Sequence, residues 1–171
     1  MKATGIVRRI DDLGRVVIPK EIRRTMRIRE GDPLEIYVTG EGEVVFRKHS
    51  PLLQLSHQAE ACAAAVYRAA GLSCLVADRD HIIASAGLPR REVSELPLPN
   101  AALQAMEQRT SYTGEEQMPG VGDCSVVACP ILSAGDVLGC VLTVVPGGGT
   151  EGSAQALTLA AAGFLGAESE L

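Results

Sequence analysis

The stretch that decides the fold of the N-terminal part covers residues 4–48 and reads TGIVRRIDDLGRVVIPKEIRRTMRIREGDPLEIYVTGEGEVVFRK. It begins with two short runs of β-branched residues, 6–7 and 16–18, whose side chains fit a pleated surface. The residues between the runs, Asp11 to Gly14, are typical of a tight turn. We therefore predict two short strands joined by this turn.

A short helix and a hairpin follow the second run. Pro19 suits the first helical turn, where its missing amide hydrogen is not needed, and the helix continues over residues 20–26. Residues 34–38 alternate apolar and polar side chains with period two, and residues 43–48 pair back after a turn at 39–42. The predicted order is ββαββ.

The sign of the charge changes along the chain. Residues 1–50 hold eleven basic and eight acidic side chains, whereas the remaining 121 residues hold five basic and thirteen acidic ones. The head is therefore positive, although the formal net charge of the whole chain is −5. Such asymmetry of charge between the two parts of a chain is typical of a domain that binds a polyanion, joined to a domain that does not. The charge break near Pro51 favours two domains, 1–50 and 51–171.

The predicted head is too small to fold alone. It has only two aromatic residues, Tyr37 and Phe46, and it has no cysteine and no cluster of metal ligands. A unit of this size buries too little apolar surface to offset its chain entropy. We therefore expect a homodimer in which two chains interleave their hairpins and share one core. Sharing also places two sets of arginines on one continuous face.

Arginine is well suited to binding nucleic acid. Its planar fork donates two parallel hydrogen bonds to phosphate, and it can also read guanine edges in the major groove. For any single arginine, pairing with a nearby carboxylate is an equally good explanation. Those carboxylates belong to Asp11, Asp12, Glu21 and Glu30. Pairing does not account for the whole set, because two strand arginines and two helix arginines surround one turn. Four other basic residues are interpreted as charges for solubility and for the helix end: Arg27, Arg29, Arg47 and Lys48.

The run DLGRVVIPKEIRRTMRIREGDPLEIYV, residues 12–38, resembles the swapped-hairpin DNA-binding domain of the AbrB/SpoVT family of bacterial transition-state and sporulation regulators. The resemblance extends over residues 1–51. It implies an intertwined, dimeric β-barrel that binds double-stranded DNA. The positions that match the family's DNA-contacting arginines are Arg8, Arg15, Arg23 and Arg24. Two further candidates for DNA contact are Lys2 and Arg9.

Apolar residues spaced three and four apart form a heptad-like seam along a predicted helix over residues 52–70. The seam consists of Leu52, Leu55, Ala59, Cys62, Val66 and Ala69. It suits packing against another helix, either of this chain or of a partner, and it equally suits an ordinary amphipathic helix buried in one domain.

Strands and further helices complete the second domain. We predict strands over 73–78, 81–85, 124–131 and 137–145, a loop or broken helix over 87–100, and helices over 101–109 and 153–165. The order αββαβ(β)βα, with helices at both ends and a central antiparallel sheet, is an α+β sandwich.

Four segments are similar to the GAF-like C-terminal domain of sporulation regulators in the same family: SCLVADRDHIIASAG, MEQR, CPILSAGDVLGCVLTV and AAGFLG. The expected fold class is therefore mixed, with a dimeric swapped-hairpin barrel followed by a GAF-like domain. The resemblance further implies a homotetramer, in which two DNA-binding dimers join through C-terminal helices, and a small-molecule effector of unknown identity. Residues 88–123 differ most from the family and are shortened in the region that shapes a GAF pocket.

No set of catalytic or cofactor-binding residues stands out. Residues 147–152 match the GxGxxG spacing of a dinucleotide site, but the sequence ends 19 residues later, before the parallel strand and acidic residue that such a site requires. The three histidines lack partners for nucleophilic catalysis. We expect no enzyme activity, no metal and no cofactor. The five cysteines lie in apolar surroundings without a CxxC pair, which favours reduced core residues; redox sensing by Cys124 or Cys129 is a second interpretation.

These features predict a cytosolic, homo-oligomeric, DNA-binding regulator of transcription. No apolar run reaches the roughly 18 to 20 residues that cross a bilayer, and the first residues lack the apolar core of a signal peptide. The resemblance implies control of genes in the developing spore, as an activator at some promoters and a repressor at others. Two alternatives stay open. One is a swapped-hairpin antitoxin with a short, disordered tail, and the other is a ligand or redox sensor that acts mainly through the C-terminal domain.

Overall fold

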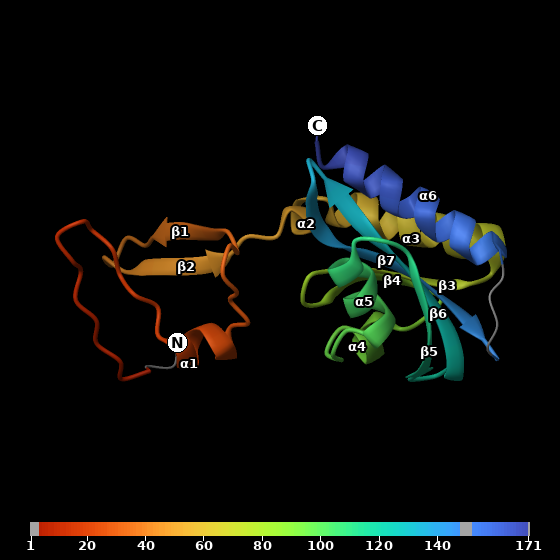
Figure 1. Ribbon diagram of the computed structural model, residues 1–171, viewed down its shortest axis with the longest axis horizontal. Coiled ribbons are helices and arrows are strands. Elements are labelled where there is room, and N and C mark those ends of the chain that lie inside the picture. The colour runs from red at the N-terminus through yellow and green to blue at the C-terminus, as the bar shows by residue number, and fades with distance from the viewer. Residues whose placement is uncertain (1–3, 148–151, 171) are drawn as a thin grey trace. The chain divides into compact units, whose positions relative to one another are not determined.

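The computed structural model describes residues 4–147 and 152–170, which belong to two compact units (Figure 1). The units are Met1–His49 and Ser50–Leu171. Lys2 and the middle of the glycine-rich motif, residues 148–151, lie outside the described residues. The regular elements of the first unit are α1 (Lys20–Thr25), β1 (Leu34–Val38) and β2 (Val44–Lys48).

Specific residues mark both ends of helix α1, Pro19 at its start and Arg27 just after its end. Pro19 is the N-cap, with φ −57° and ψ 148°, and its carbonyl oxygen accepts the first hydrogen bond of the helix, from Arg23 N–H at 2.9 Å. Arg23 and Arg24 lie in the last turn, where positive charge favours the helix dipole. The chain leaves the helix at Arg27, whose φ is 52°, and Ile28 N–H closes the end by donating to the Arg23 carbonyl oxygen at 2.7 Å.

Residues 6–7 and 16–18, which we predicted to be strands, are not strands in the single chain. The turn between them is confirmed: Gly14 N–H donates to the Asp11 carbonyl oxygen at 3.0 Å, and Asp11 N–H donates to that of Arg15 at 3.1 Å. Residues with high β-propensity form a strand only when a neighbouring strand supplies ladder hydrogen bonds. No such neighbour pairs with these two runs among the residues that the structure describes. The predicted ββαββ order is therefore αββ in one chain.

The second unit is a five-stranded antiparallel sheet with helices on both faces (Figure 1). Its strands lie in the spatial order β4-β3-β7-β6-β5. Their bounds are β3 (Ser73–Asp78), β4 (Ile82–Ala86), β5 (Tyr112–Met118), β6 (Gly122–Ser133) and β7 (Asp136–Pro146). The helices are α2 (Pro51–Gln54), α3 (Ser56–Ala70), α4 (Arg90–Val93), α5 (Asn100–Gln108) and α6 (Gly152–Glu168). The predicted α+β arrangement with a central antiparallel sheet is confirmed.

Each face of this sheet carries its own apolar core. Helices α3 and α6 lie side by side over one face (Figure 1), and their core includes Val76 and Val141 from the strands. Helices α4 and α5 cover the other face, where the core includes Leu75 and Leu142. The division follows from the alternation of side chains along each strand, which sends neighbouring residues to opposite faces.

The first predicted helix of this unit is broken at Leu55, which separates α2 from α3 with φ −96° and ψ 23°. Leu52 in α2 is fully buried and packs close to Gly139 of β7. The Ser50 hydroxyl, just before α2, donates to Asp78 Oδ2 at 3.2 Å. Helix α2 therefore anchors the start of the second unit to the end of β3 and to β7.

The heptad-like seam packs within its own unit. Ala59 and Val66 are buried against the sheet and α6, and Cys62 is half-buried there. Ala69, at the end of the seam, is exposed, whereas Ala63 outside the seam is fully buried. An amphipathic helix buried in one domain therefore describes α3 better than a seam for another chain.

Strand β5 is an element that the sequence pattern did not locate. Thr113, Glu115 and Gln117 are exposed at this edge of the sheet, so the segment lacks the apolar run that marks a buried strand. It pairs with β6 along its whole length, from Tyr112 to Met118. The ladder of hydrogen bonds, and not an apolar pattern, makes this segment a strand.

Gly139 offers a steric test of the α2 anchor. A Cβ added there would overlap the Ala77 carbonyl oxygen and come within 2.7 Å of Leu52 Cδ1. Because the Ala77 backbone is held in the sheet and cannot move away from the added methyl group, we expect Gly139→Ala to lower the free energy of unfolding by roughly 1–3 kcal/mol. The control is Gly152→Ala, whose added methyl meets nothing within 4 Å. Thermal unfolding followed by circular dichroism measures both, and an unchanged midpoint for Gly139→Ala would contradict the close packing.

Candidate nucleic-acid interface

The turn at residues 11–15 is organised by the Asp11 carboxylate. Its Oδ1 accepts the backbone amides of Leu13 at 3.0 Å and Arg15 at 2.8 Å, and its Oδ2 accepts Arg15 Nε–H at 2.8 Å. These bonds favour the charged carboxylate and lower the pKa of Asp11, with the Arg15 backbone amide as the largest cause. The Arg15 side chain stays 70% exposed. One carboxylate therefore fixes the turn and also orients Arg15 at the surface.

The predicted DNA-contacting arginines all lie on the surface. Arg8 and Arg9 precede the turn, Arg15 follows it, and Arg23 and Arg24 share the last turn of α1; all five are exposed. Within residues 4–147 and 152–170, Arg15 is the only one of the five that forms an ion pair. The other four side chains are therefore not neutralised by the neighbouring carboxylates, in contrast to the pairing that the sequence also permitted.

Lys48 has a structural role that its sequence position did not predict. Its Nζ donates to the Arg27 carbonyl oxygen at 2.9 Å and lies 3.0 Å from Asp32 Oδ2. Asp32 Oδ2 also accepts the Arg29 amide at 2.8 Å, and the Asp32 side chain is only 1% exposed. Lys48 therefore ties β2 to the segment after α1, and its interpretation as a solubility charge is wrong.

The β1–β2 hairpin has one apolar face. Its register pairs Ile36 with Phe46 and Val38 with Val44, so these four side chains lie on the same side. Each is exposed, from 42% for Phe46 to 76% for Val38. The opposite face carries Tyr37, with the Arg47 guanidinium carbon 4.8 Å from its ring centroid. The apolar face is what a second molecule would cover.

The first unit has almost no interior of its own. Among residues 4–49, Pro19 alone is buried. Large apolar side chains around the turn are exposed instead, namely Ile6, Val7, Ile10, Leu13, Val16 and Val17. Because buried apolar surface is what offsets the conformational entropy of a folded chain, this unit requires surface from another molecule to complete its fold.

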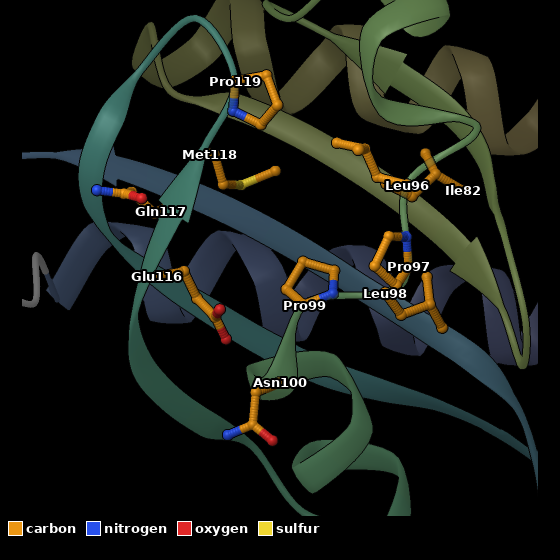
Figure 2. Close-up of a pocket in the computed structure, with 10 residues that line it drawn as sticks. All are labelled: Ile82, Leu96, Pro97, Leu98, Pro99, Asn100, Glu116, Gln117, Met118 and Pro119. Atoms are coloured by element: carbon orange, nitrogen blue, oxygen red, sulfur yellow. The ribbon is translucent and has the colours of Figure 1, made fainter.

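The second unit contains a pocket between β4, β5 and the segment that precedes α5 (Figure 2). Its volume is about 280 Å³. It is lined by Ile82, Leu96, Pro97, Leu98, Pro99, Asn100, Glu116, Gln117, Met118 and Pro119. The sequence predicted no ligand-binding residues, because a pocket assembled from two strands and a loop leaves no spaced motif.

The cysteines are free thiols, and all except Cys62 are buried. Burial raises the pKa of Cys74 to about 12 and that of Cys129 to about 11. Burial, followed by the charge of Glu116, also raises the pKa of Cys124. The thiolate is the form that reacts with oxidants, so these environments favour cysteine as a core residue over redox sensing at Cys124 or Cys129.

Sequence comparison finds relatives for both units. Residues 54–170 match the family described as stage V sporulation protein T C-terminal, transcription factor. Residues 7–52 match the family described as antidote-toxin recognition MazE, bacterial antitoxin. Stage V sporulation protein T of Bacillus subtilis (strain 168) is 46% identical over 149 residues, which cover 83% of this chain and 84% of that protein.

Each unit also has a relative of its own. The transition state regulatory protein AbrB of Bacillus subtilis (strain 168) is 59% identical over 51 residues, which cover 30% of this chain and 52% of AbrB. The crystal structure of the GAF-B domain of DevS from Mycobacterium smegmatis superposes with a TM-score of 0.56 at 20% identity, over 67% of this chain and 92% of that one. This last likeness concerns the fold alone. The predicted mixed fold class, an AbrB-type unit followed by a GAF-like α+β domain, is confirmed.

Titration of Asp11 tests the geometry of the turn. We expect carboxyl ¹³C NMR to give Asp11 a pKa below its ordinary value of 3.8. Because the pKa is lowered, the turn gains stability above that ordinary value and loses it as pH falls through the pKa of folded Asp11. Arg15→Gln should raise the pKa only part of the way, since the backbone amide of residue 15 remains. Arg9→Gln is the matched control. An ordinary pKa in the unmodified chain would rule out these hydrogen bonds.

Proposed function

Since the chain belongs to the stage V sporulation protein T family of transcription factors, we propose that the N-terminal units of a homodimer bind double-stranded DNA through the exposed arginines around the Gly14 turn. The chain is a DNA-binding regulator of sporulation. The residues proposed for DNA contact are Arg8, Arg15, Arg23 and Arg24, with Lys2 and Arg9 in supporting positions. We further propose that it activates some promoters and represses others.

The observation that carries the proposal is the exposed arginine set in a unit that shares 59% identity with AbrB. A DNA duplex carries one negative charge for about each 1.7 Å of its axis, and arginines that neutralise phosphates release condensed counterions. Asp11 already orients the Arg15 side chain, so less side-chain entropy is lost when Arg15 meets DNA. Guanidinium groups on both sides of one turn suit phosphate contact and base reading together.

A homodimer through the N-terminal unit is supported by the apolar side chains that one chain leaves in water. The hairpin face of Ile36, Val38, Val44 and Phe46 is exposed, and Pro19 is the only buried residue among 4–49. Two interleaved hairpins would cover these faces and supply neighbours for residues 6–7 and 16–18. The same pairing doubles the number of arginines offered to one duplex.

Helix α6 supports a second association surface. From Gly152 to Ala167 it carries no charged side chain, and Leu159 and Phe164 are exposed on its outer side at 61% and 48%. A helix that is apolar all round is usually buried on all sides. We therefore propose that two DNA-binding dimers join through these C-terminal helices as a homotetramer.

The pocket of the second unit supports control by a small molecule, in addition to assembly. We propose that the regulator responds to a small-molecule effector through its GAF-like domain, as the family resemblance implied. We place it in the cytoplasm, because a transcription factor meets its DNA there. Separately, none of the helices within residues 4–147 and 152–170 combines the length and the apolar character needed to span a membrane.

The antitoxin alternative has one observation in its favour, the match of residues 7–52 to an antitoxin family. That alternative requires a short, polar, disordered tail. Residues 50–171 instead form a compact unit with a five-stranded sheet and two apolar cores. Family membership also favours a regulator over an enzyme. We therefore retain transcription regulation as the function.

Single arginine variants test the DNA-binding surface. At physiological salt, Arg15→Ala and Arg23→Ala should each abolish retention of a DNA fragment selected from a random pool by the unmodified chain. At lower salt, where weak binding is still measurable, every arginine–phosphate interaction that is removed should reduce the log-log salt slope by about 0.9, and each substitution removes two such interactions from a dimer. Arg15→Lys should restore part of the retention, because it keeps the charge without the planar fork. Electrophoretic mobility assays over a salt series measure both quantities.

The matched control for these variants is Arg91→Ala in α4, which removes one exposed positive charge outside the proposed surface. It should retain DNA as the unmodified chain does. Light scattering should give every variant the unmodified oligomeric size, so that a failure to retain DNA reports on DNA contact and not on assembly. Normal retention by both Arg15→Ala and Arg23→Ala would remove the arginine surface from the proposal.

The two association surfaces can be separated in the same chain. We expect light scattering to give a tetramer for the unmodified chain and a dimer for Leu159→Asp, which retains DNA. Val38→Asp, which places a charge in the apolar hairpin face, should also give a dimer, but one that no longer binds DNA. The double variant should be a monomer. A tetramer that survives Val38→Asp would contradict the shared N-terminal core.

A further inference from the structure

The lining of the pocket in the second unit is mostly apolar and includes an ionisable residue. Figure 2 shows Leu96, Pro99 and Met118 around the space, with Glu116 beside Pro99. Among the described residues that line it, Glu116 is the only ionisable one. The pocket therefore has a single charged group in a wall of aliphatic and proline side chains.

Glu116 is positioned by the helix that begins beside it. Its Oε1 accepts Ala101 N–H at 2.8 Å, in the first turn of the nine-residue helix α5. Within residues 4–147 and 152–170, this is the only hydrogen bond that the Glu116 side chain makes. The carboxylate is half-buried. Its second oxygen, Oε2, is thus left to accept a hydrogen bond from a ligand.

The two other polar residues of the lining compete little with Glu116. The Gln117 amide donates to Asp123 Oδ1 at 3.1 Å, and Figure 2 shows its side chain directed away from the pocket. Asn100 is exposed as the first residue of α5. The polar anchor of the pocket is therefore an acceptor with negative charge.

This arrangement disfavours anions. Amide groups at a helix N-terminus can attract an anion, but Glu116 already supplies the negative charge at the start of α5. A second anion would have to displace Glu116 or lie beside it, against charge repulsion in a partly dehydrated space. A cationic donor instead gains a charge-assisted hydrogen bond, which is shorter and stronger than a neutral one.

The size of the pocket limits the apolar part of the ligand. Pockets for drug-sized ligands have volumes of about 300–1,000 Å³, and an apolar cavity of about 150 Å³ is enough for benzene. A pocket of about 280 Å³ therefore has room for one small ring or branched aliphatic group with a short polar arm. Nucleotides, which are larger and anionic, fit neither its size nor its charge.

We propose that this pocket binds a compact organic cation, with an ammonium group that donates to Glu116 Oε2 and a small apolar body against Leu96, Pro99 and Met118. The inference rests on the proposed function, because it names the chemical class of the effector that the regulator senses. The ammonium group is also tied, through Glu116, to the first turn of α5. Binding therefore stabilises the contact between β5 and α5.

Three probes of similar size separate charge from shape: benzylammonium, benzyl alcohol and benzoate. Isothermal titration calorimetry of the intact chain at neutral pH should give benzylammonium a dissociation constant at least tenfold below that of benzyl alcohol, and no binding of benzoate. Glu116→Gln keeps an oxygen that accepts Ala101 N–H, so the fold should survive. In this variant benzylammonium should bind no better than the alcohol.

The matched control is Glu115→Gln, the neighbouring exposed carboxylate on β5, which should keep the preference for benzylammonium. Three outcomes would overturn the proposal: benzoate binds as tightly as benzylammonium, Glu116→Gln leaves the preference intact, or no probe binds at roughly 10 mM. DNA retention by the same preparations distinguishes a failure of the proposed ligand class from a failure of the proposed regulatory function. Normal retention with failed probes removes the ligand class alone, whereas an unmodified chain that retains no DNA would count against the regulator itself.

Discussion

Residues 4–49 leave most of their apolar side chains exposed to water within one chain. Pro19 is the single buried residue among 4–49, while the hairpin face and the segments around the turn are open. In the proposed homodimer, folding and association of this unit are one process, because the surface that stabilises it belongs to another copy. On that proposal the DNA-binding surface exists only in the assembled state, and affinity for DNA depends on the concentration of the chain as well as on the proposed arginines.

The second unit has the opposite character. Both faces of its sheet are covered by its own helices, and a buried hydrogen bond of 2.6 Å joins the hydroxyls of Thr143 in β7 and Thr158 in α6. In the proposed homotetramer, the second units hold the chains together independently of the N-terminal units. This association would raise the effective concentration of the N-terminal units and favour their pairing without any additional interaction between them.

Local signals were sufficient for much of this fold. Pro19 marked the start of α1, alternating residues marked β1 and β2, and the Asp11–Gly14 turn followed from its composition. The exposed arginines were also identified from the sequence, because both the excess of basic residues in 1–50 and the family resemblance indicated them. Features that depend on contacts between distant residues could not be predicted from the sequence. Among the described residues, the runs 6–7 and 16–18 have strand composition but no strand partner in one chain, and Lys48 gained its role from Asp32, whose side chain is 1% exposed. Strand β5 was not predicted, because its pairing with β6 and not its polar sequence makes it a strand. The pocket was not predicted either, because its lining residues come together only in the folded chain.

The polar edge strand β5 disfavours the addition of strands from other copies to the sheet. Strand β5 ends the sheet with backbone groups that could recruit a strand from the next copy, yet it presents Thr113, Glu115 and Gln117 to water. Carboxylates brought face to face along such a seam repel each other, so edge-to-edge stacking into fibres is disfavoured. The β5 edge is therefore a poor template for adding a strand from another copy, so the two association surfaces proposed above do not compete with pairing along this edge.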